Sequence, residues 1–298
     1  MVKNMADKDL DTKLDSATWS EVLVQALPYI KQWVGKVVVV KYGGNAMLNE
    51  DLKKAVMEDI VLLNTIGIQV VLVHGGGPEI NRLLEIKGIN THFIDGLRVT
   101  TPEIMENIEM VLTGSVSPAL ATLFNANDVP TVSVSGKDNK IIEATIRSES
   151  LGLVGQVTQV NTAYLNHVIE GGFLPVISPI AYGPDGQSLT INSDEAACHI
   201  ARALGAEKMI LLTDVAGVYQ DFLDPHTLIS RLTPSSIKDA ITAGFISGGM
   251  IPKLECCLSA LEGGVEACHI INGTQKHSLI LELFTKHGIG TMITEELQ

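Results

Sequence analysis

The chain has 298 residues, of which 46% are hydrophobic and 18% charged, and its formal net charge is −13. The hydrophobic fraction is typical of a globular protein with a large core and excludes a disordered chain. The acidic balance, without any lysine or arginine cluster, argues against nucleic-acid binding and against attachment to an anionic membrane. No apolar segment reaches membrane-spanning length and no signal-peptide core is present, so we expect a cytoplasmic protein.

The first elements in chain order are a polar tail and a helix. Residues 1–17 are polar and charged, and we expect them to be disordered. Over residues 18–35 apolar side chains recur at helical spacing, with Thr18 or Ser20 as the N-cap and Gly35 at the end. This helix precedes the first strand and belongs to no βα unit. Its apolar stripe needs a covering surface, which is either a partner subunit or the rest of its own domain.

From residue 36 onward strands alternate with helices. Continuous β-branched segments at residues 36–42 and 68–74 run into glycines, and amphipathic helices follow them. This alternation predicts an α/β fold with a mainly parallel central sheet covered by helices. Residues 129–180 hold shorter strand-like segments, which we expect to form hairpins beside the main sheet. The alternation resumes at residue 208, and we expect two lobes joined near residues 190–206.

Two glycine-rich loops, at residues 43–44 and 75–77, follow the first two strands. Glycine lets backbone amides approach an anion closely, and a following helix N-terminus adds a favourable dipole. Ligands bind outside the carboxyl ends of parallel strands, so the two loops suggest two anionic groups held near each other. Ordinary turns are the alternative. Neither loop matches a Walker A motif or a dinucleotide-binding fingerprint.

Two lysines are candidates for phosphoryl-transfer chemistry. Lys41 ends an otherwise apolar strand, where a charged side chain is costly unless it serves a site. Lys253 lies in the first turn of a predicted helix, whose dipole favours an anion and gives a cation no support. Phosphoryl transfer needs positive charge around the moving phosphate and little covalent chemistry from the protein. Two lysines from opposite lobes would supply that charge, whereas each lysine alone could be an ordinary surface residue.

Other polar side chains complete the candidate site. Asp194 could hold both lysine ammonium groups while Asn192 contacts the substrate; the alternative is an ordinary helix N-cap from Ser193 or Asp194. Arg98 is the candidate for a substrate carboxylate, because its planar guanidinium binds carboxylates bidentately. Residues 213–219 follow a buried strand and could hold the ribose or adenine of a nucleotide.

The chain contains the segments VVVVKYGGNAM, VVLVHGGGPEIN, FIDGLRVTT, LTINSDEAA, LLTDVAGVY and SGGMIPKLE, in this order. From about residue 20 to residue 293 it thereby resembles the acetylglutamate kinases of the amino acid kinase family. The resemblance implies a three-layer αβα sandwich, with an acyl-substrate lobe at residues 36–205 and a nucleotide-binding lobe at residues 206–298. It further implies phosphorylation of N-acetyl-L-glutamate by ATP in arginine biosynthesis, with Mg²⁺ carried by the nucleotide and no dedicated metal ligand in the protein.

The resemblance also assigns roles to residues. Lys41 and Lys253 would stabilise the transferring phosphoryl group, and Asp194 would organise them. The implied substrate contacts are Gly44, Gly76, Gly77, Arg98 and Asn192, and the implied nucleotide contacts are Gly43, Thr213, Asp214, Gly217, Tyr219, Gly249 and Met250. Arg98 would bind the α-carboxylate.

Family members that arginine inhibits resemble this chain in their N-terminal helix and C-terminal segment. Their helix interlaces dimers into a hexameric ring, so we expect a homohexamer built as a trimer of dimers. Glu282 would pair with the arginine guanidinium, with His269 and Gly288 nearby and Tyr29 closing the site. We therefore expect inhibition by L-arginine. Signal proteins of the PII type bind some family members, and the sequence neither establishes nor excludes that partner.

Other functions fit the sequence less well. A kinase of a related acyl acceptor, such as an acetylaminoadipate derivative, is the nearest alternative, although the motif order favours acetylglutamate. A carbamate kinase is disfavoured because Arg98 and Asn192 match an acylated amino-acid site. A catalytically silent arginine sensor would have lost Lys41, Asp194 or Lys253, and all three are present. A Rossmann dehydrogenase would need the dinucleotide fingerprint that the chain lacks. The four cysteines have no metal-site spacing and are interpreted as reduced thiols.

Overall fold

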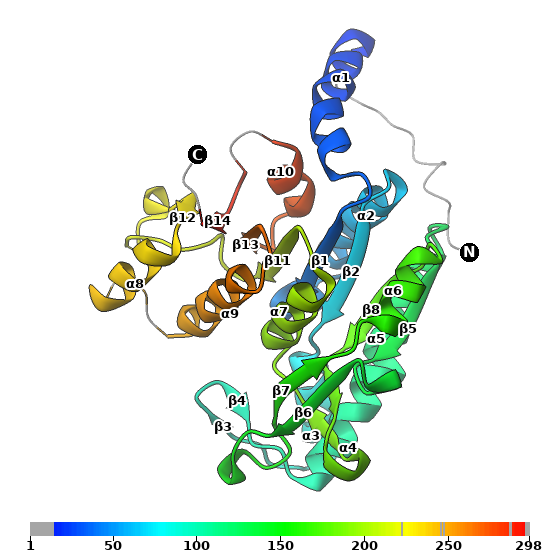
Figure 1. Cartoon of the computed structure of the whole chain (residues 1–298), viewed down its shortest axis with the longest axis vertical. Coiled ribbons are helices and arrows are strands. Elements are labelled where there is room, and N and C mark those ends of the chain that lie inside the picture. Colours follow the sequence, from blue (N-terminus) through cyan, green and yellow to red (C-terminus); the bar gives the residue numbers. More distant parts are fainter. Residues whose placement is uncertain (1–14, 222, 245, 247, 286–287, 296–298) are drawn as a thin grey trace.

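The computed structural model describes residues 15–221, 223–244, 246, 248–285 and 288–295. The main strands are β1 (Val37–Tyr42), β2 (Gln69–His74), β5 (Thr131–Ser135), β8 (Leu174–Ser178), β11 (Lys208–Thr213), β12 (Arg231–Leu232), β13 (Ala267–Asn272) and β14 (Thr291–Thr294). They form one sheet in the order β12-β14-β13-β11-β1-β2-β8-β5 (Figure 1). Every neighbouring pair is parallel except β13 with β14, which confirms the predicted mainly parallel sheet.

Helices cover both faces of this sheet. The helices are α1 (Ser16–Trp33), α2 (Glu50–Thr65), α3 (Gly77–Ile86), α4 (Pro102–Val111), α5 (Ser117–Asn125), α6 (Ala163–Glu170), α7 (Ser193–Leu204), α8 (Pro234–Thr242), α9 (Met250–Glu262) and α10 (Ser278–Phe284). One core joins the sheet to α2, α3, α4, α5 and α10, and the other joins it to α6, α7, α8 and α9. In β1 the side chains alternate, with Val38 and Val40 in the first core and Val39 in the second. The three-layer αβα arrangement is therefore confirmed.

Residues 129–180 differ in part from the prediction. The expectation that all their strands form hairpins beside the main sheet is wrong for β5 and β8, which pair with each other in parallel inside it. The chain between them includes α6, which supplies the crossover that a parallel pair requires. Strands β6 (Ile142–Ile146) and β7 (Gly155–Val160) do form an antiparallel pair. With β9 (Ile180–Tyr182) and β10 (Ser188–Thr190) they make a separate four-stranded sheet.

Both predicted lobes contribute strands to the one central sheet. Strands β11 to β14 come from the predicted nucleotide-binding lobe and continue the sheet beyond β1. The predicted boundary at residue 205 coincides with the left-handed C-cap of α7, Gly205. The division into an acyl-substrate lobe and a nucleotide-binding lobe stays a prediction about function.

The N-terminal helix α1 projects from the body of the molecule (Figure 1). It begins earlier than predicted, because Asp15 rather than Thr18 or Ser20 is its N-cap: Asp15 Oδ1 accepts from the amides of residues 17 and 18 at 2.9 Å. Residues 1–14 of the predicted disordered tail lie outside the described residues. Leu23 and Val24 are 62% and 69% exposed, so the described part of the chain leaves this apolar side uncovered. None of the described helices is long and apolar enough to cross a membrane.

Candidate functional site

The two glycine loops lie side by side because their strands are neighbours in the sheet. Tyr42 of β1 is in register with His74 of β2, the last residues of their strands. A Cβ atom built on Gly43 would lie 3.6 Å from the Gly75 Cα atom. The first loop enters a 3₁₀ turn, η2 (Gly44–Met47), and the second enters α3. The expected convergence of both loops on one edge of the sheet is therefore present.

Lys41, Asp194 and Lys253 meet beside these loops although they come from β1, α7 and α9. Lys41 Nζ lies 3.0 Å from Asp194 Oδ1, and Lys253 Nζ lies 2.5 Å from Asp194 Oδ2. The Lys41 and Asp194 side chains are 9% and 11% exposed, and that of Lys253 is 24% exposed. One carboxylate thus bridges two ammonium groups, which is the arrangement that the sequence predicted.

The charges in this cluster favour a bound anion. Burial alone would raise the pKa of Asp194, but the ammonium groups of Lys41 and Lys253 outweigh it and hold that pKa at about 2. Asp194 is therefore ionised at neutral pH. Two cations and one anion leave one net positive charge, and the N-termini of α7 and α9 add dipoles of the same sign. A bound phosphate would therefore be attracted by the two ammonium groups and by the N-termini of both helices.

Asn192 is the N-cap of α7, so the alternative that Ser193 or Asp194 plays this part is wrong. Asn192 Oδ1 accepts from the backbone amides of Asp194 at 2.8 Å and Glu195 at 3.4 Å. This cap fixes the first turn of α7 and with it the backbone that carries the Asp194 carboxylate. Asn192, Asp194 and Lys253 all line a cleft of about 1270 Å³. The Asn192 amide therefore faces the same cleft as the charged cluster.

Arg98 lies at the end of the small hairpin formed by β3 (Phe93–Ile94) and β4 (Leu97–Arg98). Its guanidinium donates from Nη1 to Thr91 Oγ1 at 3.0 Å and from Nη2 to Asn81 Oδ1 at 2.5 Å. The Arg98 guanidinium carbon also lies 4.7 Å from the centre of the Phe93 ring. Residues 94–97 of the hairpin line the cleft, whereas Arg98 does not. The structure therefore brings Arg98 to the margin of the site with its guanidinium already oriented.

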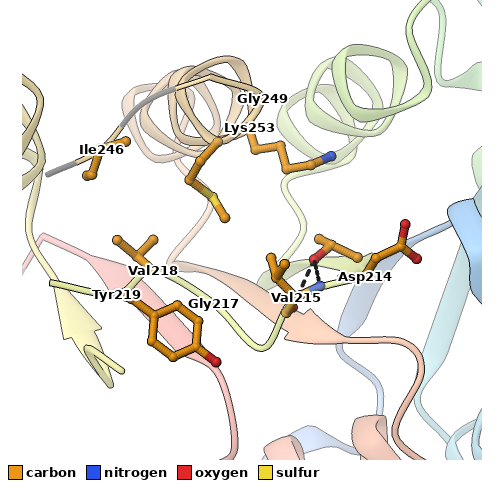
Figure 2. A pocket seen from close by; sticks show the side chains of 10 residues that line it. Asp214, Val215, Gly217, Val218, Tyr219, Ile246, Gly249 and Lys253 are labelled. Atoms are coloured by element: carbon orange, nitrogen blue, oxygen red, sulfur yellow. Dashed lines mark hydrogen bonds between the residues drawn. The ribbon is translucent and has the colours of Figure 1, made fainter. Parts of the chain in front are cut away.

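A second cavity, of about 360 Å³, lies between the loop after β11 and the first turn of α9 (Figure 2). The predicted nucleotide contacts that line it are Thr213, Asp214, Gly217, Tyr219, Gly249 and Met250; Gly43 does not. Val218 and Ile246 add apolar surface suited to a purine ring. Val218 lies within the predicted segment 213–219, whereas sequence reasoning did not single out Ile246. Lys253 lines this cavity as well as the cleft, and its side chain reaches toward the end where Asp214 lies (Figure 2).

Three of the residues assigned to an arginine effector, His269, Glu282 and Gly288, form a separate group. His269 Nδ1 lies 2.6 Å from Glu282 Oε1, and Glu282 Oε2 accepts from the amides of residues 289 and 290. Gly288 lies against the same carboxylate, since a Cβ there would be 2.6 Å from Oε2. Tyr29 lies one helical turn before Trp33 on α1, and α1 contacts α10, which carries Glu282.

Lys208 extends this group and was missed by the sequence analysis. Its Nζ atom lies 2.5 Å from His269 Nε2 and 4.8 Å from the centre of the Trp33 ring. Burial lowers the pKa of Lys208 to about 8, in spite of the nearby Glu282 carboxylate. Because Lys208 can only donate, His269 accepts at Nε2 and donates from Nδ1 to Glu282. The signal was available, because a lysine at the start of an apolar strand is as unusual as Lys41 at the end of one.

A sequence model of the amino acid kinase family matches residues 36–272. Proteins named acetylglutamate kinase from Thermoanaerobacter pseudethanolicus and Methanobrevibacter smithii are each 48% identical to the chain. The first match covers 95% of both chains, and the second covers 91% of this chain and 98% of the relative. The chain belongs to the acetylglutamate kinases of the amino acid kinase family. The resemblance drawn from the six motifs is thereby confirmed.

Solved structures agree with this membership of the amino acid kinase family. Crystal structures of N-acetylglutamate synthase from Neisseria gonorrhoeae, complexed with coenzyme A and either N-acetyl-glutamate or L-arginine, give TM-scores of 0.81 and 0.78 at 28% and 27% identity. These matches cover 94% and 93% of this chain but only 64% and 66% of the synthase chain. A carbamate kinase from Giardia lamblia bound to AMP-PNP, 18% identical with a TM-score of 0.66, covers 88% of this chain and 99% of its own and shares the fold.

Proposed function

We propose that this protein transfers the γ-phosphoryl group of ATP to the γ-carboxylate of N-acetyl-L-glutamate, a step of arginine biosynthesis. The observation that carries the proposal is the position of Lys253, which lines both the cleft and the smaller cavity and pairs with Asp194. A nucleotide in the smaller cavity and an acyl substrate in the cleft would meet at this side chain. The 48% identity to proteins named acetylglutamate kinase supports the choice of substrate.

In the proposed reaction a γ-carboxylate oxygen of N-acetylglutamate attacks the γ-phosphorus of ATP. The bond from that phosphorus to the bridging oxygen breaks, and ADP leaves with the bonding electron pair. Lys41 and Lys253 neutralise the charge that develops on the phosphoryl oxygens, and Asp194 keeps both ammonium groups in place. The backbone amides of Gly44 and Gly76 donate to the phosphoryl group and the substrate. None of these groups has to exchange a proton.

The nucleotide is proposed to lie in the smaller cavity with its base among Val218, Ile246 and Met250. Its phosphates would then point toward Lys253. Mg²⁺ bound to the nucleotide would neutralise the β- and γ-phosphate oxygens. We propose that the nucleotide carries this Mg²⁺, as the resemblance to the family implies.

On the acyl side we propose that Arg98 binds the α-carboxylate and Asn192 the backbone of the acetylated amino acid. Hydrogen bonds to Asn81 and Thr91 hold the Arg98 guanidinium in one orientation, so binding the carboxylate costs little side-chain entropy. Asn192 uses Oδ1 for the cap of α7, which leaves its amide N–H groups as the donors for substrate.

We further propose that L-arginine inhibits the enzyme at the group around Glu282. A buried carboxylate suits a guanidinium because its oxygens accept hydrogen bonds, and the amides of residues 289 and 290 hold this one in place. Trp33 links this group to the N-terminal helix through Lys208. The related synthase structure complexed with L-arginine supports the choice of effector. The uncovered apolar side of α1 is proposed to join dimers into a hexamer.

The test is a coupled ADP-release assay with N-acetyl-L-glutamate, N-acetyl-aminoadipate and carbamate as alternative acceptors. N-acetylglutamate should give the highest kcat/KM, and a hydroxamate assay should detect its acyl phosphate. Preference for either other acceptor would overturn the proposed substrate. The Lys41→Ala variant is the control that assigns the activity to this site. Millimolar L-arginine should lower the rate, and unchanged activity would refute the proposed feedback inhibition.

A further inference from the structure

The side chain of His74 has no part in the reaction proposed above, yet it lies directly beneath the second glycine loop. His74 is the last residue of β2 and is fully buried. Its Nδ1 atom lies 2.7 Å from the Gly75 carbonyl oxygen, and its Nε2 atom lies 3.1 Å from Ser178 Oγ. A buried titratable side chain with both ring nitrogens engaged at the edge of a site suggests a function beyond filling space.

The partners of His74 determine its tautomer. A carbonyl oxygen only accepts hydrogen bonds, so the ring carries its proton on Nδ1 and donates it to Gly75. Nε2 is then an acceptor for the single proton of the Ser178 hydroxyl, and the carbonyl oxygen of Leu112, 3.3 Å from Ser178 Oγ, is a competing acceptor. Burial lowers the pKa of His74 to about 4, so the ring is neutral at physiological pH. The ring thus has one donor, Nδ1, and one acceptor, Nε2.

The hydrogen bond to Gly75 has a consequence for the next amide. The Gly75 carbonyl and the Gly76 N–H belong to one peptide unit, which is planar and trans, so they point in opposite directions. With the carbonyl held toward the buried imidazole, the Gly76 N–H must point away from the core. The Gly75 N–H is fixed as well, because it donates to the Tyr42 carbonyl at 2.8 Å. Both the N–H group and the carbonyl group of Gly75 are therefore held by hydrogen bonds.

The other side of the loop is packed against a π-helical turn, η3 (Leu112–Val116). A Cβ atom on Gly76 would lie 2.4 Å from Leu112 Cδ2 and 3.6 Å from Val116 Cγ2, so a side chain at this position would displace the Leu112 side chain. Since the Leu112 carbonyl also approaches Ser178, the loop, the histidine and the π-helical turn form one packed network. Single π-helical turns occur frequently at functional sites.

We propose that His74 is a positioning residue, whose neutral imidazole holds the Gly75–Gly76 peptide so that the Gly76 amide is aimed at the substrate and the transferring phosphoryl group. This inference rests on the proposed function, because it needs Gly76 to donate in the reaction. Without the hydrogen bond from Nδ1 the peptide can rotate, and the Gly76 amide loses its fixed direction. A donor that must be oriented anew in each catalytic cycle stabilises the transition state less well.

The test compares two substitutions that each keep one nitrogen position of the ring. In His74→Asn the side-chain amide N–H replaces Nδ1 and can still donate to Gly75, whereas in His74→Gln the amide reaches the Nε2 position and the donor to Gly75 is lost. We expect kcat of His74→Gln to fall by about 30-fold and that of His74→Asn to stay within about 5-fold of the wild type. The KM for ATP should change little in either variant.

A role in packing alone predicts the opposite order, because asparagine leaves the larger cavity and should harm the protein more. Activities are therefore compared per folded protein, with thermal unfolding measured alongside. Equal kcat values for the two variants, or a lower value for His74→Asn, would overturn the proposal. Ser178→Ala removes the donor to Nε2 and should lower kcat less than His74→Gln does.

A second measurement does not depend on the proposed activity. A long-range ¹H–¹⁵N spectrum of the labelled protein, assigned with the His74→Gln variant, should show a neutral ring protonated on Nδ1 at pH 7 and still neutral near about pH 5.5. A ring protonated on Nε2, or one that titrates near about pH 6.5, would overturn the inference whatever the enzyme phosphorylates. An inactive wild type with the expected tautomer would instead contradict the proposed function and, with it, the assigned use of the Gly76 amide.

Discussion

Lys253 Nζ lies 2.5 Å from Asp194 Oδ2, so a single ion pair joins the first turn of α9 to the first turn of α7. The other oxygen of the same carboxylate lies 3.0 Å from Lys41 Nζ. Without the carboxylate, two ammonium groups this close would repel each other and move apart. Asp194 therefore lets the protein keep two cations within reach of one phosphate before any ligand arrives.

Removing either cation should slow the chemical step. We expect Lys41→Ala and Lys253→Ala each to lower kcat by about 10²-fold or more, because each ammonium stabilises charge that develops in the transition state. Steady-state kinetics with N-acetylglutamate and ATP would measure this. Lys54→Ala, which removes an exposed lysine on α2, is the matched control and should leave kcat unchanged. A kcat within a few-fold of the wild type in both active-site variants would show that the assigned mechanism is wrong.

Replacing Asp194 by Asn should reduce both activity and stability. The pKa of about 2 lies below the ordinary value of 3.8, so the stabilising ionised form is complete above about pH 4 and is lost only as the pH falls through about 2. We expect a loss of roughly 3 kcal/mol in the free energy of unfolding, because two largely buried ammonium groups lose their partner. Urea unfolding should give the same difference from the wild type at every pH from about 5 to 8. A difference that shrinks toward pH 5 would contradict this pKa.

The two lysines of the charged cluster could be predicted from sequence because each contradicts its local surroundings. Lys41 stands in an apolar strand and Lys253 in a helical first turn, and both were found on that ground. The row of hydrogen-bonded side chains formed by Lys208, His269 and Glu282 was predicted only in part. His269 and Glu282 came from the resemblance, whereas the place of Lys208 depends on β11 and β13 being neighbours in the sheet. Strand order of this kind is not encoded in any local pattern.

The misplaced strands have a similar cause. Residues 131–135 and 174–178 are short segments, and periodicity cannot decide whether such a segment joins the main sheet or a hairpin. The structure places both in the main sheet because α6 returns the chain in the same direction. The caps were also misassigned: Asp15 and Asn192 each precede the residues that the sequence analysis named as possible caps. Several neighbouring residues had suitable side chains, and only the backbone geometry selects among them.

Gly44 should not tolerate a side chain. Its φ angle is +73°, and a Cβ there would lie 3.0 Å from Asp214 Oδ1. We expect Gly44→Ala to lower kcat/KM by about 10-fold or more, because the loop must shift away from the phosphoryl group. Gly88→Ala is the control, since Gly88 has a φ angle of +69° but no atom within 4 Å of the added Cβ. Both variants should lose comparable stability, and an equal loss of activity in both would refute the local explanation.

Arg98→Ala should mainly raise the KM for N-acetylglutamate. Its guanidinium is oriented by Asn81 and Thr91, so its removal takes away substrate binding rather than charge at the reacting phosphate. We expect a rise in KM of about 10-fold or more with kcat within about 3-fold, and little recovery in Arg98→Lys because lysine lacks the planar fork. The exposed Arg82 on α3 provides the control substitution Arg82→Ala. A pure effect on kcat would contradict the assigned role.

Asp59 should make the stability of the protein depend on pH. This fully buried residue of α2 accepts from Leu279 N at the start of α10, and one of its oxygens lies 2.7 Å from His277 Nδ1. Burial raises the pKa of Asp59 to about 6, although the contacts with His277 act against the shift. Because the folded state holds this proton more tightly than the unfolded chain does, the contribution to stability is complete below about pH 4 and is lost as the pH rises through about 6.

Asp59→Asn removes this titration and keeps an oxygen that can accept from Leu279 N. Relative to the variant, the wild type should gain about 1.4 kcal/mol in the free energy of unfolding when the pH falls from 8 to 5. Urea unfolding of both proteins at several pH values would measure the change, with Asp51→Asn on the exposed side of α2 as the matched control. A difference between wild type and Asp59→Asn that stays constant from pH 8 to pH 5 would mean that the Asp59 carboxyl does not titrate in this range. In that case the contacts with His277 and the α10 amides must stabilise the ionised carboxylate more strongly than burial opposes it.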